Sequence, residues 1–399
     1  MSSFSFQVSR EIPGAHGRSG VLSTPHGEIK TPAFIPVGTG ATLKALTPEQ
    51  LDATGAQAVL ANAYHLYLRP GSGVIDEAGG LGKFMNWAKP TFTDSGGFQV
   101  MSLGVGFKKV IDMTGDEQTP IQSKEKLAWI SDTGVEFKSH IDGSRHVFTP
   151  ELSMKIQHEI GADITFAFDE LTTLHHDRPY QIESLKRRTH PWAEQSLAEH
   201  QKLNKERSHR PPQALFGVIQ GAQYEDLRRE SSRFMAARDF DGFGLGGAYT
   251  KKDIGVIVGW MAEELPEDKP RHMLGISEPN DIFDCIENGA DTFDCVSPAR
   301  VARNGAIYTP TGRVNIRNAK YKRDFSPPDP TCDCYTCAHY TNAYLNHLFR
   351  SGELLGLTLA TIHNERFIVR MVDEIRDAIE NGTFYEFKTQ WLNRYYFSK

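Results

Sequence analysis

The feature of this 399-residue chain that most restricts its fold is a series of short apolar runs separated by segments of helical character. The runs cover residues 58–60, 164–168, 215–219, 242–245, 273–276 and 292–296. Strands buried on both faces have this composition, and helices between them provide the crossovers of a parallel sheet. We therefore predict an α/β fold, specifically a (β/α)8 TIM barrel in a single domain of residues 1–399. An open, doubly wound sheet would produce the same alternation and is the alternative.

The composition is that of a folded globular protein, with 39% hydrophobic and 24% charged residues. The first residues contain no apolar core flanked by basic side chains, and nowhere do eighteen apolar residues follow one another. Signal peptides and transmembrane helices need those features. We therefore expect a cytoplasmic location and no membrane partner.

Polar residues and glycines stand at the ends of several apolar runs and in one further segment that has the composition of a strand end. They are Asp94, Ser95, Asp169, Gln220, Gly246, Gly247 and Asp294. In a barrel, the C-terminal ends of the strands assemble the active site, so these residues are site candidates. Each signal alone is weak, because Asp-Ser-Gly-Gly is also the composition of a capped turn and an aspartate is also a common helix N-cap.

Three of the five cysteines, Cys332, Cys334 and Cys337, lie within six positions. With His363 as the fourth ligand they would form a closed tetrahedral shell, which is typical of structural zinc. His339 is the rival fourth ligand, although it stands only two residues after Cys337. Buried free cysteines are the other alternative, but thiols so close together would be an oxidation hazard.

A second signal is local positive charge in a chain whose net charge is −6. Residues 296–323 contain no acidic residue and carry Arg300, Arg303, Arg313, Arg317, Lys320, Lys322 and Arg323. Such a segment is typical of phosphate binding, although a solvated face balanced by distant acids is the alternative. Because it leads from Asp294 into the cysteine cluster, we predict a basic, zinc-binding subdomain at about residues 297–365.

Together, these segments resemble one family, the tRNA-guanine transglycosylases, also called queuine tRNA-ribosyltransferases. The matching pieces follow the family's order and include Asp94-Ser95-Gly96-Gly97-Phe98-Gln99, residues 61–66, 166–170, 217–221, 293–296, 300–305 and 315–318, and the cysteine cluster with His363. The resemblance implies an enzyme that exchanges guanine at the wobble position of a tRNA anticodon for a 7-deazaguanine base. It also implies one structural zinc ion per chain and a homodimer.

By that resemblance, Asp294 would be the nucleophile that attacks ribose C1′, and Asp94 the general acid and base. The residues that would bind the base are Ser95, Phe98, Asp169, Gln220, Gly246, Gly247 and Leu274. Phe98 and Leu274 would lie on either side of its ring. Arg300, Arg303 and Arg317 would bind the anticodon loop, whose bases are accessible because they are single-stranded.

The chain also departs from the family in three places. After the glycine pair it has Ala248 where leucine is common, and Lys252 where glutamate is common. A lysine would repel the cationic arm of 7-aminomethyl-7-deazaguanine, so we predict that the incoming base is queuine or the uncharged 7-cyano base. The segment 104–131 is longer than the family leads us to expect, and could serve as a lid, a dimer element or a partner surface.

Three other functions fit parts of the sequence. They are a non-catalytic RNA-binding accessory subunit of a heteromeric transglycosylase, a DNA-directed guanine exchanger, and a nucleoside hydrolase. The presence of both Asp94 and Asp294 argues against the accessory subunit. The arginines that follow Asp294 resemble those of the tRNA-acting members more than those of the DNA-directed ones.

Overall fold

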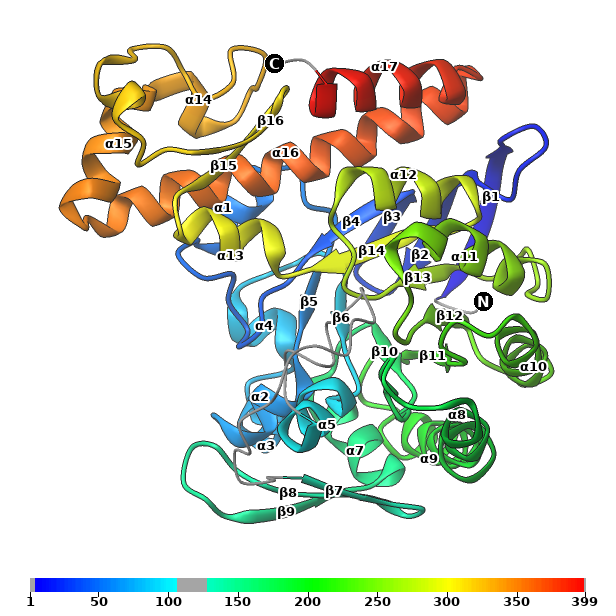
Figure 1. Cartoon of the computed structure of the whole chain (residues 1–399). Helices are drawn as coiled ribbons and strands as arrows, with labels where there is room; N and C mark the ends of the chain where they lie inside the picture. Colours follow the sequence, from blue (N-terminus) through cyan, green and yellow to red (C-terminus); the bar gives the residue numbers. More distant parts are fainter. Residues whose placement is uncertain (1–3, 106–127, 398–399) are drawn as a thin grey trace.

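The centre of the molecule is an eight-stranded parallel sheet, seen in a computed structural model that describes residues 4–105 and 128–397 (Figure 1). Its strands are β4 (Ala33–Pro36), β5 (Val59–Ala61), β6 (Thr91–Thr93), β10 (Ile164–Phe166), β11 (Ala214–Ile219), β12 (Gly242–Leu245), β13 (Arg271–Met273) and β14 (Thr292–Cys295). The last strand, β14, pairs with the first, β4. Just beyond β4, the Gly38 N–H donates to the Leu60 carbonyl of β5 at 2.8 Å. The sheet is nearly closed, which confirms the predicted barrel over the doubly wound alternative.

The six predicted runs each overlap a barrel strand, but three of the eight strands differ from the prediction, and one of them, β6, matches no run. β13 begins two residues before its predicted run, because Arg271 and His272 are polar and find buried partners: the Arg271 guanidinium donates to backbone carbonyls, and His272 bonds to Thr292. β4 has no counterpart among the runs, since only three apolar residues separate Pro32 from Pro36. A strand this short leaves little signal in a sequence.

The connecting helices surround this sheet (Figure 1). They are α1 (Pro48–Asp52), α2 (Ala63–Leu68), α3 (Ser72–Glu77), α4 (Leu81–Met85), α5 (Gly97–Val105), α7 (Pro150–Ile160), α8 (Arg178–Ser184), α9 (His190–Glu206), α10 (Glu225–Ala236), α11 (Ile254–Ala262), α12 (Pro279–Glu287), α16 (Leu354–Asn381) and α17 (Phe384–Phe397). Local signals set their ends, as α7 illustrates. The Thr149 side chain accepts from the Leu152 N–H, Pro150 opens the first turn, and Gly161 ends the helix at φ +72°.

One end of the barrel is closed by an antiparallel sheet of β1 (Ser5–Glu11), β2 (Arg18–Thr24) and β3 (Gly27–Thr31). Leu22 and Ile29 from this sheet share one hydrophobic cluster with Phe92, Phe166 and Phe216 of the barrel strands. The barrel interior is therefore a packed core, and a site can form only at the C-terminal ends of the strands.

A second antiparallel sheet, β7 (Ala128–Ser131), β8 (Gly134–Lys138) and β9 (Arg145–Phe148), lies between β6 and α7 in the sequence. Its β7–β8 turn is held against α9, because the Trp192 indole N–H donates to the Asp132 carbonyl at 2.7 Å. Of the segment 104–131, residues 106–127 lie outside the described residues.

The chain after β14 continues through α13 (Ser297–Arg303), the hairpin β15 (Ala306–Thr309) and β16 (Gly312–Asn315), a 3-10 helix (Ala319–Arg323), α14 (Tyr335–His339) and α15 (Asn342–Ser351). Ile307, Ile316 and Leu345 belong to a small hydrophobic cluster of these elements. Figure 1 shows them gathered around one end of α16. That residues 297–365 form a subdomain within one domain stays a prediction. None of the helices in the described part of the chain is long and apolar enough to cross a membrane.

Candidate functional site

A cavity of about 820 Å³ lies at the C-terminal ends of the barrel strands. Each of the eight strands contributes a lining residue at or just beyond its end, and these are Val37, Asn62, Asp94, Asp169, Gln220, Gly246, Leu274 and Asp294. The predicted site residues Ser95, Phe98, Gly247, Arg300 and Arg303 also line it. Because the C-terminal ends of all parallel strands in a barrel meet at one face, residues from Val37 to Arg303 come together here.

Asp294 lies within β14, and its side chain is 13% exposed. Its Oδ1 accepts hydrogen bonds from the His272 Nε2 at 3.1 Å and from the Gly275 N–H at 3.2 Å. Among the described residues, no group donates to Oδ2. One oxygen of this carboxylate is therefore held by two donors, while the other keeps its lone pairs for a ligand.

Asp94 follows β6 and lies in a dense set of donors. Its Oδ1 accepts from the backbone N–H groups of Ala63, at 2.9 Å, and Gly96, at 3.3 Å, while the Asn62 amide donates to Oδ2. Burial nevertheless raises the pKa of Asp94 to about 7, and the negative charge of Asp294 contributes to that shift. Asp94 can therefore both give and take a proton near neutral pH, as a general acid and base must.

Asp169 and Gln220 form a pair at the ends of β10 and β11. The Gln220 Nε2 donates to Asp169 Oδ2 at 2.6 Å. Burial raises the pKa of Asp169 to about 6. The hydrogen bond from Gln220 lowers this pKa, and the negative charge of Glu170 raises it. The Gln220 Oε1 is buried without a partner in the described structure. This pair therefore offers both acceptors and a donor to a ligand with a polar edge.

The glycine pair lies directly beside Gln220. A Cβ on residue 247 would come within 2.5 Å of the Gln220 Oε1, and residue 247 has φ +100°, a conformation that favours glycine. Only glycine at position 247 therefore lets the backbone come this close to the Gln220 side chain. Ala248 lines the cavity next to it, whereas Lys252 is exposed on a 3-10 helix (Lys251–Asp253) and is not among the lining residues.

Phe98 and Leu274 bring apolar surface to the same cavity. Phe98 lies in the first turn of α5, and Leu274 directly follows β13. Both are half-buried, and Leu274 packs against the core of the barrel. They thus add apolar surface to a site whose other contributions are mainly polar.

The predicted arginines separate into two groups. Arg300 and Arg303, one turn apart on α13, line the cavity. Burial lowers the pKa of Arg303, and the positive charge of Arg300 lowers it further, so an anion would relieve their repulsion. Arg317 is exposed outside this lining, with its guanidinium 5.7 Å from the centre of the Phe349 ring. Of the remaining basic residues, Arg313 pairs with Glu278 at 3.2 Å.

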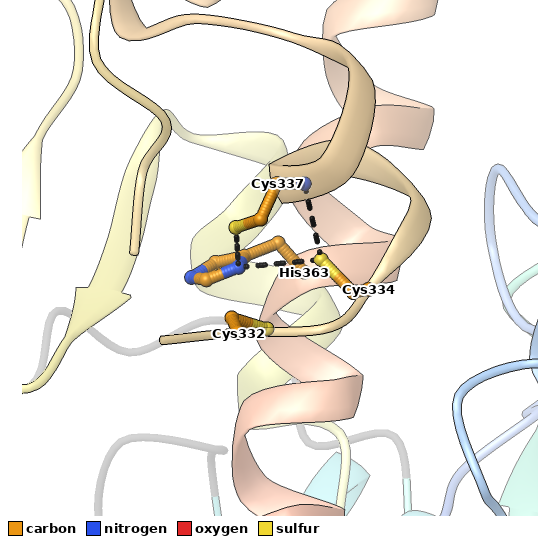
Figure 2. A group of neighbouring side chains, drawn as sticks. All are labelled: Cys332, Cys334, Cys337 and His363. Atoms are coloured by element: carbon orange, nitrogen blue, oxygen red, sulfur yellow. Dashed lines mark hydrogen bonds between the residues drawn. The ribbon is translucent and has the colours of Figure 1, made fainter. Parts of the chain in front are cut away.

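The cysteine cluster also comes together as predicted, with the Sγ atoms of Cys332, Cys334 and Cys337 and the His363 ring within 4.8 Å of one another (Figure 2). The His363 Nδ1 lies 3.2 Å from the Cys337 Sγ, and its Nε2 lies 2.7 Å from the Tyr308 carbonyl. The carbonyl can only accept, so Nε2 carries the proton and Nδ1 is free to be a ligand. The rival ligand His339 is exposed and is not part of this group.

Two residues in contact with the carboxylates have no role in the sequence analysis. Asn62 caps α2 through its Oδ1 and donates to Asp94, and His272 bonds to Asp294. A signal for His272 exists, since it stands two positions before Leu274, and alternate residues of a strand point to the same side. It lies outside the predicted run because that run begins with the first apolar residue, Met273.

Comparisons with known proteins found relatives along nearly the whole chain. The family model described as queuine tRNA-ribosyltransferase matches residues 14–397. The queuine tRNA-ribosyltransferase of Thermoanaerobacter pseudethanolicus is 44% identical over 398 residues, which cover 99% of this chain and 98% of that protein. The enzyme of the same name from Herpetosiphon aurantiacus is 44% identical over 98% of this chain and 93% of its own length. The one from Lactococcus lactis subsp. lactis is 44% identical over 95% of this chain and 92% of its own length.

Proposed function

This chain belongs to the queuine tRNA-ribosyltransferase family and is a pentosyltransferase, and we propose that it exchanges the wobble guanine of a tRNA anticodon for a 7-deazaguanine base through a covalent aspartyl-ribose intermediate. One observation carries the proposal. Asp94 and Asp294 line the same cavity, and they differ in how their carboxyl groups are held. Asp94 has a pKa near 7, while one oxygen of Asp294 accepts no hydrogen bond from the residues that the structure describes.

In the first step, a lone pair of Asp294 forms a bond to ribose C1′. The bond from C1′ to guanine breaks, and its electron pair leaves with the guanine, which takes the proton of Asp94. The carboxylate charge on Asp294 disappears as it becomes an ester, just when Asp94 becomes charged. The two carboxyl groups therefore share about one negative charge throughout. The charge on Asp294 favours protonated Asp94 before the step, and this repulsion is gone once Asp94 has given up its proton.

In the second step, the ionised Asp94 takes a proton from the incoming base. The base nitrogen attacks C1′, the bond to Asp294 breaks, and its electron pair returns to the carboxylate. Two displacements at one carbon retain the configuration of the sugar, as in retaining glycosidases. Each group ends the cycle in the state in which it began.

Base recognition follows from the polar groups at the ends of β10, β11 and β12. Guanine and 7-deazaguanines present N–H donors and one carbonyl acceptor on the same edge. Asp169 can accept from the N–H groups of the base, while the Gln220 amide and the Gly247 backbone N–H can donate to its carbonyl oxygen. Phe98 and Leu274 would pack on either side of the ring, with Ser95 near its edge. The base must leave its stack to enter the cavity.

The RNA would bind at α13. Arg300 and Arg303 line the cavity close to one another, and a phosphate of the anticodon loop would reduce the repulsion between their positive charges. Arg317, outside the cavity lining, would contact a more distant phosphate. Because tRNA is the substrate, we expect the enzyme to act in the cytoplasm.

For the incoming base, we propose queuine or the 7-cyano base. Ala248 is a small side chain in the cavity lining, next to the proposed base-binding glycines, and leaves room for a substituent on the base. Lys252 is exposed four residues after Ala248, and its positive charge would disfavour a cationic arm on the base. Exchange assays with each base would test this, and efficient use of the aminomethyl base would contradict it.

For the metal, we propose one zinc ion held by Cys332, Cys334, Cys337 and His363. Three thiolates and one imidazole are the donor set of a closed structural zinc site. The ion would brace the β15–β16 hairpin, through the bond from His363 to Tyr308, and not take part in the reaction.

We also propose a homodimer. Tyr335, Tyr344 and Leu354, from α14, α15 and the start of α16, are 51%, 39% and 77% exposed, and the Tyr340 and Tyr344 rings stack at 5.5 Å. Exposed aromatic groups of this kind are enriched in protein interfaces. Sedimentation at several concentrations would measure the oligomeric state.

The proposed function is tested by guanine exchange. The chain is incubated with an anticodon stem-loop and radiolabelled guanine, and label in the RNA is counted. We expect incorporation at the wobble position only, and none with Asp94→Asn. Binding of the stem-loop without any exchange would contradict the proposal and favour the accessory-subunit alternative.

A further inference from the structure

His272 is a fully buried residue of β13 in direct contact with Asp294. Its Cα pairs in register with Thr292 of β14, and its ring spans from Thr292 to Asp294, two residues further along. The Nδ1 lies 2.9 Å from the Thr292 Oγ1, and the Nε2 lies 3.1 Å from the Asp294 Oδ1. Both ring nitrogens are thus in use inside the barrel.

The chemistry of these partners fixes the proton on the ring. An ionised carboxylate can only accept, so the Nε2 must carry a proton when Asp294 is charged. In the neutral ring, the Nδ1 then accepts from the Thr292 hydroxyl, which is free to donate. Phe92 and Phe166 hold the ring in place, with centroids 5.5 and 5.1 Å from that of His272. The donor is therefore both oriented and enclosed.

We propose that His272 is a positioning residue that selects which oxygen of Asp294 reacts, an inference that rests on the proposed function. The N–H groups of His272 and Gly275 both occupy Oδ1, so the attacking lone pair belongs to Oδ2. When Oδ2 bonds to C1′, Oδ1 becomes the ester carbonyl oxygen. When the incoming base displaces the ester, the returning charge is shared with Oδ1, where the two donors already stabilise it.

His272 therefore acts in both half-reactions, but most strongly in the second. In the first, it holds the carboxylate in the geometry for attack. In the second, it stabilises the leaving carboxylate, so its loss makes the covalent intermediate break down more slowly. A histidine that served only to join β13 to β14 would change folding stability without changing the relative rates of the two steps.

The test compares His272→Phe, His272→Gln and Thr292→Val in single-turnover experiments with an anticodon stem-loop. Phenylalanine keeps a ring between Phe92 and Phe166 but has no donor. Glutamine can bring an amide N–H close to the position of the imidazole Nε2. Thr292→Val leaves the histidine but removes the hydroxyl that orients it, and gives an independent test should the phenylalanine variant fold poorly.

We expect His272→Phe to slow breakdown of the adduct about 100-fold, the scale of removing one preorganised donor, with the Kd of the stem-loop nearly unchanged. Adduct breakdown in His272→Gln should be at least about tenfold faster than in His272→Phe, because the amide N–H restores part of the lost hydrogen bond. Thr292→Val should slow breakdown more than formation. Equal slowing of both steps, or no recovery with glutamine, would overturn the inference. Absence of any adduct in the unmutated chain would instead refute the proposed function.

Discussion

Burial raises the pKa of Asp94 to about 7, and the negative charge of Asp294, in the same cavity, contributes to the shift. This relationship makes the first half-reaction depend on pH. Only protonated Asp94 can give a proton to the leaving guanine, so the rate of adduct formation should fall about tenfold per pH unit above pH 7. Rapid-quench measurements between pH 5.5 and 9, about one and a half to two units either side of that pKa, would show it. A rate that stays constant to pH 9 would exclude Asp94 as the acid.

Asn62 offers a control for that assignment. Its amide donates to Asp94 Oδ2 and lowers the pKa of the carboxyl group, against the effect of burial. Asn62→Ala should therefore raise the pKa of Asp94 and move the alkaline limb of the profile to higher pH. It also removes the N-cap of α2, which costs about 1 kcal/mol of stability. A limb that moves to lower pH would contradict the assignment.

Gly247→Ala should impair base binding without unfolding the protein. The added Cβ would come within 2.5 Å of the Gln220 Oε1 and would force a strained conformation at φ +100°. Displacing Gln220 also disturbs its hydrogen bond to Asp169, so we expect the KM for the base to rise at least about tenfold, equivalent to about 1.4 kcal/mol. Gly73→Ala in α3 is the matched control, because outside the helix's own backbone no described residue has an atom within 4 Å of the new Cβ. Equal KM values for both variants would count against the base-binding role.

Arg303→Ala should weaken tRNA binding and reduce its dependence on salt. Arg303 lines the cavity beside Arg300, and each phosphate contact that is lost should lower the slope of log K against log salt by about one. Binding of the stem-loop would be titrated at several salt concentrations. Arg233→Ala on α10, an exposed arginine paired with Glu264, should leave the slope unchanged. The same slope in both variants would show that Arg303 on α13 does not contact the RNA.

Cys337→Ser should abolish metal binding. The Cys337 Sγ lies 3.2 Å from the His363 Nδ1, within the four-residue group. We expect elemental analysis to find one zinc per chain before the change and none after it, with Tm lower by at least about 5 °C because binding of structural zinc contributes to folding. Cys285→Ala, in the barrel core, should keep the metal. A metal-free chain of unchanged Tm would contradict a structural role.

The barrel could be predicted from the sequence because its longer strands, such as β11, are continuous apolar runs that are too short to be buried helices. β4 could not be predicted, since its three apolar residues lie between Pro32 and Pro36. The three N-terminal strands alternate buried and exposed residues only in part, and their role as a cover for the barrel depends on contacts far away in the chain.

The candidate site shows the same division. Aspartates and glycines at strand ends can be recognised in order along the chain, and so can the cysteine spacing. His272 could not be assigned, because a histidine inside a strand is as often a buried structural residue as a functional one. Its meaning depends on Asp294, which is 22 residues away in sequence and becomes a neighbour only when β13 pairs with β14.

The proposed mechanism requires a covalent bond between Asp294 and the RNA. The most direct measurement incubates the chain with an anticodon stem-loop and a 7-deazaguanine base, followed by denaturing electrophoresis, and compares it with Asp294→Asn. We expect an RNA-protein adduct that survives denaturation in the unmutated chain and is absent from Asp294→Asn. An adduct of equal yield in Asp294→Asn, or base exchange by a chain that never forms an adduct, would contradict it.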